Sequence, residues 1–162
     1  MSFLPSRGWN EERLQLTSLL ISSFQKERAR PQHTRAALAM AQPILIQLIR
    51  AGVTAGVHSH LEREPDSVHV RDDDGSSCVH WAALCGRLGL LQHLELHGAP
   101  LDARVEESGM TPMHWACTSG RLNVVRYLID AGVDIDAADL RRTTPLMLAV
   151  QYHHDVLLAW LL

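Results

Sequence analysis

The sequence predicts an all-α fold in which helix-turn-helix units, joined by short β-hairpin loops, stack into a solenoid. The main observation is one motif in three copies, at residues 77–82, 111–116 and 144–149. The copies begin 34 and 33 residues apart. A second observation is a glycine at the same distance after each of the first two copies. A fixed period of this length indicates a repeat architecture, because each unit buries its apolar face only against its neighbours.

Each unit is expected to contain a turn, a short first helix, a tight turn and a longer second helix. The Ser or Thr that opens the motif can cap the first helix, and Pro112 and Pro145 follow at the first helical position. Gly86 and Gly120 stand where the first helix must stop and reverse, since glycine enters left-handed conformations freely. The second helices have apolar residues at helical spacing, namely Leu90, Leu91, Leu94, Val124, Val125 and Leu128.

Two histidines occupy the same place in successive motifs. We expect His80 and His114 to hydrogen-bond to neighbouring loops and so tie adjacent repeats together, which we favour over a catalytic or metal-binding role. Met147 replaces the histidine in the third unit. The third unit therefore lacks one of these ties.

The region before the clear repeats is interpreted as a degenerate repeat, residues 31–71. Residues 46–53 resemble residues 126–133, which places them on a second helix, with Pro43 near its start. On that alignment residues 54–66 are a loop insertion. Two further repeats are predicted at residues 72–104 and 105–137.

The two ends of the chain are expected to differ. Residues 1–30 are predicted to hold an amphipathic helix, 11–28, that covers the first repeat, with a membrane-surface or partner helix as the alternative. Residues 138–162 are predicted to be a truncated repeat that ends in an apolar helix. Terminal repeats normally have a polar outer face, so either another segment covers this end or the chain is a fragment of a longer protein, which we favour.

The composition limits the class of protein. The net charge of −3 argues against general nucleic-acid binding, and no apolar run is long enough to cross a membrane. Cys78, Cys85 and Cys117 are odd in number and lie inside repeats, which indicates free thiols and a cytoplasmic location. No cofactor motif and no catalytic triad is present, so we expect no cofactor and no catalytic residues in this chain.

The Thr-Pro-Met-His-Trp-Ala stretch and its period resemble the ankyrin-repeat family. The resemblance implies a protein-binding module that receives a partner protein or peptide on its inner helices and hairpin tips. The candidate partner-binding residues are Asp74, Trp81, Cys85, Trp115, Arg141 and Arg142. Tryptophan is enriched at binding hot spots, but simple packing between the repeats is the alternative for both tryptophans.

Tryptophan directly after the histidine, in two successive repeats, also resembles the ankyrin region of the Asp-His-His-Cys (DHHC) palmitoyltransferases. That resemblance implies a substrate-recruiting arm in which Trp115 takes part in a peptide-binding groove. The family has an asparagine where this chain has Cys85, so the peptide specificity is not carried over. No Asp-His-His-Cys motif is present in this chain. An ankyrin adaptor without any catalytic extension is the third hypothesis.

Other clusters are interpreted as structural. His58 and His60 could be two metal ligands, but zinc prefers four and no cysteine pair is near them in sequence. The three acids Asp72, Asp73 and Asp74 lack the spacing of a calcium loop and are expected at a solvated hairpin tip. No metal is therefore predicted.

Overall fold

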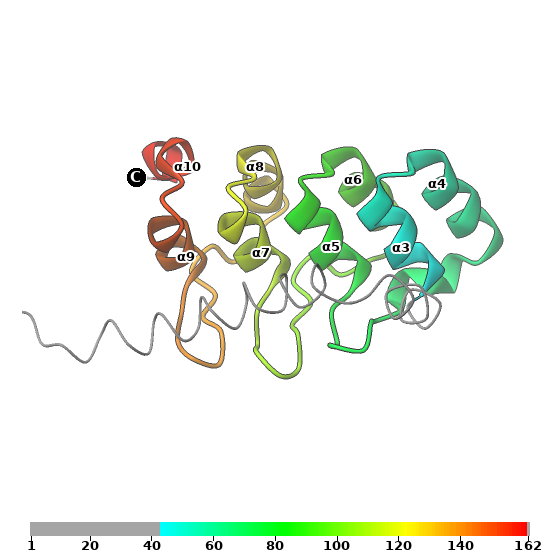
Figure 1. The fold of residues 1–162 in the computed structure, drawn as a ribbon, viewed down its shortest axis with the longest axis horizontal. Coiled ribbons are helices and arrows are strands. Elements are labelled where there is room, and N and C mark those ends of the chain that lie inside the picture. Colours follow the sequence, from blue (N-terminus) through cyan, green and yellow to red (C-terminus); the bar gives the residue numbers. More distant parts are fainter. Residues whose placement is uncertain (1–42, 162) are drawn as a thin grey trace, which may run out of the picture. The chain divides into compact units, whose positions relative to one another are not determined.

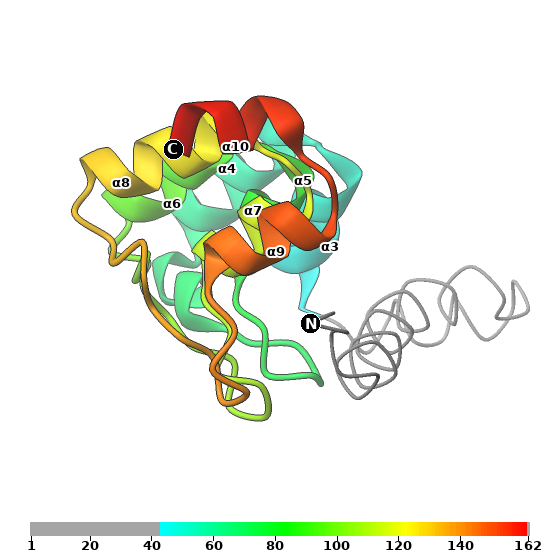
Figure 2. The ribbon, with the colours of Figure 1, turned by 90° about the vertical axis from the view of Figure 1, so that its left-hand side faces the viewer.

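The computed structural model describes residues 43–161, which fold into pairs of antiparallel helices stacked in two layers (Figures 1 and 2). The inner layer consists of α3 (Ile44–Ala51), α5 (Cys78–Cys85), α7 (Pro112–Thr118) and α9 (Pro145–Gln151). The outer layer consists of α4 (Thr54–Arg63), α6 (Leu88–Leu96), α8 (Leu122–Asp130) and α10 (Asp155–Leu161), with a 3₁₀ turn at Pro65–His69 after α4. The predicted helical solenoid is confirmed.

Hairpin-like loops connect each outer helix to the next inner helix and extend away from the two layers (Figure 2). Within residues 43–161 these loops contain no β-strand, and the pairing of Arg71 with Ser77 is an isolated bridge. The loops therefore keep the turn geometry of a β-hairpin without an extended ladder.

The core lies between the two layers. Small residues on the inner helices, such as Ala82, Ala83 and Ala116, are fully buried and let neighbouring helices approach closely. Leucines and valines of the outer helices close over them, and burying one such side chain contributes about 1.5–3 kcal/mol. Helix α5 packs against α3, α6 and α7, so nearly all of its residues are buried.

The tight turn inside each helix pair depends on glycine. Gly52, Gly86 and Gly120 all have positive φ angles, between 64° and 75°. A methyl group on Gly86 would lie 2.8 Å from Cδ of Arg121, a residue of the following repeat. The guanidinium of Arg121 donates to the Leu84 carbonyl at 3.0 Å. Glycine is therefore needed both for the backbone conformation and for this contact between repeats.

The structure corrects the first repeat. Residues 44–51 form the inner helix α3, which packs against α5, and not a second, outer helix as predicted. Pro43 directly precedes this inner helix, at its N-cap position. Residues 54–63, predicted as a loop insertion, form the outer helix α4. The error came from the Ala-Gly-Val end of the segment, which also ends an outer helix at Gly132.

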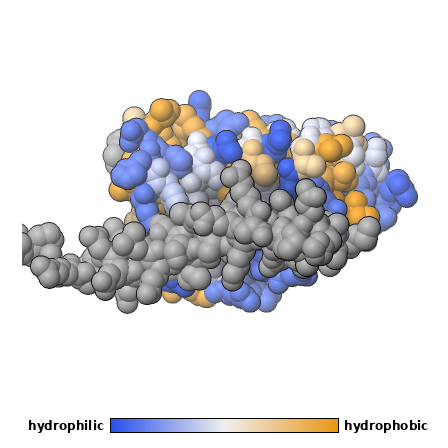
Figure 3. All heavy atoms as spheres, viewed as in Figure 1, coloured by the Kyte–Doolittle hydropathy of each residue, from blue (hydrophilic) through white to orange (hydrophobic). Residues whose placement is uncertain are grey.

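The other predicted boundaries remain predictions. The helix expected at residues 11–28 and most of the first half of the degenerate repeat lie outside the described residues. In the third repeat both helices, α9 and α10, are formed. The exposed apolar side chains of these two helices include Met147, Val150, Val156 and Trp160. Hydrophobic residues of the α10 end are visible at the upper left of Figure 3.

Candidate protein-binding surface

The two motif histidines connect successive repeats. The backbone N–H of Ser77 donates to Nδ1 of His80, whose Nε2 donates to the Met110 carbonyl at 3.1 Å. His114 repeats the pattern with Thr111 and with the Thr143 carbonyl at 3.0 Å. Burial lowers the pKa of His80 to about 4 and also lowers the pKa of His114, so both rings are neutral at physiological pH. The predicted ties between repeats are confirmed.

The two motif tryptophans lie side by side on α5 and α7. Their rings meet edge to face, with centroids 5.3 Å apart. Trp81 is only 9% exposed, its indole N–H donates to Oδ2 of Asp72 at 2.7 Å, and the Arg50 guanidinium lies 4.3 Å from its ring centroid. These contacts fix Trp81 firmly in place and leave little of it for a partner to touch.

Trp115 differs from Trp81 in two respects. It is partly exposed, and its indole nitrogen is shielded from solvent and has no hydrogen-bond partner. The loop position that corresponds to Asp72 is Val105. The backbone N–H of Asp72 donates to the Ser76 carbonyl across the first hairpin, and the backbone N–H of Val105 donates to the Met110 carbonyl across the second. A valine offers no acceptor, so Trp115 keeps an unused donor beside partly exposed aromatic surface.

The remaining candidate residues lie on the hairpin tips. Asp74 is exposed at the first tip, and Arg141 and Arg142 are exposed at the third. The second tip, with Glu106 and Glu107, lies between them in the row of hairpins (Figure 1). The structure therefore places Asp74 on one hairpin tip and Arg141 and Arg142 on another, along one edge of the inner layer.

Asp72 is not part of a solvated tip as expected. It is 7% exposed, and its Oδ1 accepts the backbone N–H groups of Asp74 and Ser76. Asp139 does the same for Arg141 and Thr143 in the third hairpin. These aspartates hold the shape of their loops.

Cys85 ends helix α5 and is partly buried. Desolvation raises the pKa of its thiol, while Arg87, Arg121 and Arg50 act in the opposite direction. It lies one helical turn beyond Trp81, at the edge of the inner layer away from the hairpins. Sequence reasoning missed Arg50 beside Trp81, because the interaction depends on how α3 packs against α5.

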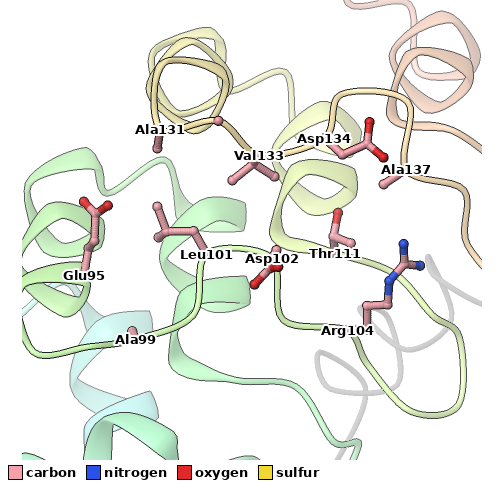
Figure 4. Close-up of a pocket in the computed structure, with 11 residues that line it drawn as sticks. Glu95, Ala99, Leu101, Asp102, Arg104, Thr111, Ala131, Val133, Asp134 and Ala137 are labelled. Carbon is pink, nitrogen blue, oxygen red and sulfur yellow. The ribbon is translucent and has the colours of Figure 1, made fainter.

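A pocket among the described residues lies elsewhere. It has a volume of about 490 Å³ and is lined by the loops that follow α6 and α8 (Figure 4). Glu95, Asp102, Arg104 and Asp134 supply its charged groups. None of the predicted partner-binding residues lines it.

The histidines considered as metal ligands lie on helix α4. The ring of His58 stacks on His93 of α6 with centroids 3.7 Å apart, and His60 lies 4.0 Å from Glu64. Within residues 43–161 no group of three or more His, Cys, Asp or Glu side chains could hold a metal ion. The same part of the chain contains no helix that is both long and apolar enough to span a bilayer.

Comparison with known proteins agrees with this architecture. A family model described as ankyrin repeats in three copies matches residues 39–139 and residues 80–162. The protein named NF-kappa-B inhibitor cactus is 43% identical over 49 residues in Drosophila yakuba and 43% identical over 47 residues in Drosophila melanogaster. These matches cover 30% and 29% of this chain but only 10% and 9% of the relatives, so the chain spans a small part of their length. Because the family matches extend over most of the sequence, the chain belongs to the ankyrin-repeat family.

Proposed function

We propose that this chain is a protein-interaction module that binds a partner protein or peptide on its inner face. We define the inner face as the exposed parts of α5, α7 and α9 together with the tips of the three hairpins. The observation that carries the proposal is the partly exposed aromatic surface of Trp115, on a fold whose repeats bind proteins. Aromatic side chains of this kind supply large contact area at small entropic cost.

The other candidate residues have different parts in this proposal. Trp81 supports Trp115 from the neighbouring helix, and Asp74, Arg141 and Arg142 supply charge at the edge. Cys85 lies at the opposite edge and would contact a partner that crosses the whole inner layer. The relatives are named as inhibitors of NF-kappa-B, which suits a binding role for such repeats. Their target is not carried over, since the matched segment is about a tenth of each relative.

The test compares two tryptophan variants of the full chain. Trp115→Ala is expected to weaken capture of partner proteins from a cell extract at least tenfold, because truncation of a central hot-spot residue commonly costs about 2 kcal/mol or more. Trp160→Ala is the matched control, since Trp160 is 43% exposed on the outer helix α10. Capture is quantified by mass spectrometry, and circular dichroism checks that both variants fold. Equal capture by the two variants would overturn the proposal.

A narrower proposal is that the chain is the substrate-recruiting region of an ankyrin-type DHHC palmitoyltransferase. Its support is the pair of His-Trp-Ala units, whose tryptophans lie in contact on adjacent inner helices. The native transcript beyond the codon for Leu162 tests it. Membrane helices and an Asp-His-His-Cys motif in that frame would support the narrower proposal, and their absence would leave the interaction module alone.

We also propose a cytoplasmic location, from the three free cysteines. Fluorescence microscopy of the tagged full chain tests this. Secretion of the tagged chain into the medium would contradict it.

A further inference from the structure

The charge of the hairpin tips changes sign along the stack. The first tip exposes Asp73 and Asp74, the second exposes Glu106 and Glu107, and the third exposes Arg141 and Arg142. The three tips follow one another along one edge of the inner layer (Figure 1). A partner that lies along this edge therefore meets negative charge at two tips and positive charge at the third.

Four other charged groups of these loops are used inside the protein. Asp72 and Asp139 accept backbone N–H groups, and the guanidiniums of Arg71 and Arg104 donate to carbonyls. Toward the rest of the described residues, the tip side chains of Asp73, Glu106, Glu107, Arg141 and Arg142 make no hydrogen bond or ion pair. These tip charges are therefore available to a partner, whereas the loop-shaping charges are not.

The tips are also held at a fixed spacing. Arg71 donates to the Arg104 carbonyl at 3.0 Å, and Arg104 donates to the Ala138 carbonyl at 2.8 Å, so each hairpin is bonded to the next. At the tips themselves, the backbone N–H of Leu140 donates to the Ser108 carbonyl at 2.9 Å. Because these hydrogen bonds hold the hairpins in place, the tip charges are preorganised, which reduces the entropic cost of binding a matching partner.

We infer that the inner face takes an extended peptide segment with basic residues at one end and acidic residues at the other. The basic end lies opposite the first two tips, and the acidic end lies opposite the Arg141–Arg142 tip. An apolar or aromatic side chain near the middle rests on the exposed part of the Trp115 ring. This inference rests on the proposed function and adds the chemistry and the order of the partner's residues.

The length of the segment follows from the helix packing. Neighbouring inner helices pack at about 8–10 Å, so the first and third tips are separated by roughly 16–20 Å. An extended chain rises about 3.3 Å per residue, so roughly six residues cover this distance. Exposed ion pairs of this kind decide order and specificity more than affinity, and salt weakens them.

The experiment selects binders for the full chain from a library of random 12-residue peptides displayed on phage. The enriched sequences are expected to separate basic from acidic residues toward opposite ends, in the same order. A synthetic peptide of the enriched sequence is expected to bind roughly tenfold more tightly than the same peptide with its charged ends exchanged. When the double variant Arg141→Glu with Arg142→Glu is the binding target, the selected peptides are expected to be basic at both ends.

The matched control is Arg63→Glu with Arg126→Glu, which changes the net charge equally but on the outer helices α4 and α8. Peptides selected against this control should keep the wild-type charge order. Enriched peptides without charge order, an order unchanged by inversion of the third tip, or no enrichment at all would each overturn the inference. If peptides bind through Trp115 without charge order, the proposed function stands and only the inference fails.

Discussion

Trp81 and Trp115 touch edge to face, yet only the indole N–H of Trp81 has an acceptor, the carboxylate of Asp72. The two residues occupy the same place in successive repeats, so the difference arises in their loops. An aspartate in the first loop is replaced by Val105 in the second. The same His-Trp-Ala sequence thus leaves one indole N–H bonded to a carboxylate and the other without a hydrogen-bond partner.

The Asp72 carboxylate is expected to be among the most important polar groups for stability. Asp72→Ala leaves the donors of Asp74, Ser76 and Trp81 without their acceptor, and each buried unpaired donor costs about 1–3 kcal/mol. Since part of this loop is reached by water, we expect a loss of roughly 2–4 kcal/mol in the free energy of unfolding. Urea denaturation followed by circular dichroism measures it.

Asp139→Ala is the matched control for that variant. Asp139 accepts two backbone N–H groups in the third hairpin and no tryptophan, and it is partly exposed. We expect a loss of about 1 kcal/mol. Equal losses for the two variants would show that the bond to Trp81 contributes nothing.

The stability of the protein is expected to depend on pH through His80. Its pKa is lowered from 6.5 to about 4 in the folded state by burial, so between these values the unfolded chain binds more protons. The contribution of the neutral His80 to the free energy of unfolding is therefore fully present above pH 6.5. It is lost as the pH falls toward 4, and the total loss is about 3 kcal/mol. His114, whose pKa is also lowered by burial, acts in the same direction.

Urea midpoints measured between pH 8 and pH 4 test this dependence. His80→Gln removes the titrating group, so the variant should be less stable at pH 8 but should lose less stability on acidification. An unchanged slope would contradict the assignment of this pH dependence to His80.

Two glycine substitutions are expected to have opposite effects. Gly86→Ala places a Cβ at a φ of 70° and against Arg121, so we expect a loss of roughly 1–2 kcal/mol. Gly89→Ala lies in α6 with open space around it and should stabilise the protein by about 0.5–1 kcal/mol. Thermal melting of both variants measures the difference, and a stabilising Gly86→Ala would refute the proposed contact between repeats.

The three cysteines are expected to react at different rates. Cys78 and Cys117 are buried, and burial raises the pKa of each thiol to about 12. Cys85 is the more exposed thiol and should be the one that iodoacetamide modifies in the native protein at pH 8. Mass spectrometry should find one adduct before unfolding in urea and three after it. Native labelling that persists in Cys85→Ser would contradict this order.

Much of the fold could be predicted from local patterns. The period of the motif, the Ser or Thr caps and the glycines fix where the helices of the later repeats begin and end, because these signals act within a few residues. The histidine ties were also predictable, since His80 and His114 stand at the same place in motifs one repeat apart. The same period, counted back from Gly86, reaches Gly52 and would have placed α3 in the inner layer.

The tertiary structure decided what local sequence leaves open. The Ala-Gly-Val segment at Gly52 stops a helix in either layer, and the packing of α3 against α5 shows that this helix belongs to the inner one. The bond between Trp81 and Asp72, and its absence at Trp115, depend on how each loop folds back on its helix. Likewise, the charged tips form one continuous surface only because the stacking of the repeats aligns three loops that are far apart in the chain. The sequence by itself thus determined the repeats, because helix caps and turns are local, whereas long-range packing decided which side chains remain for a partner.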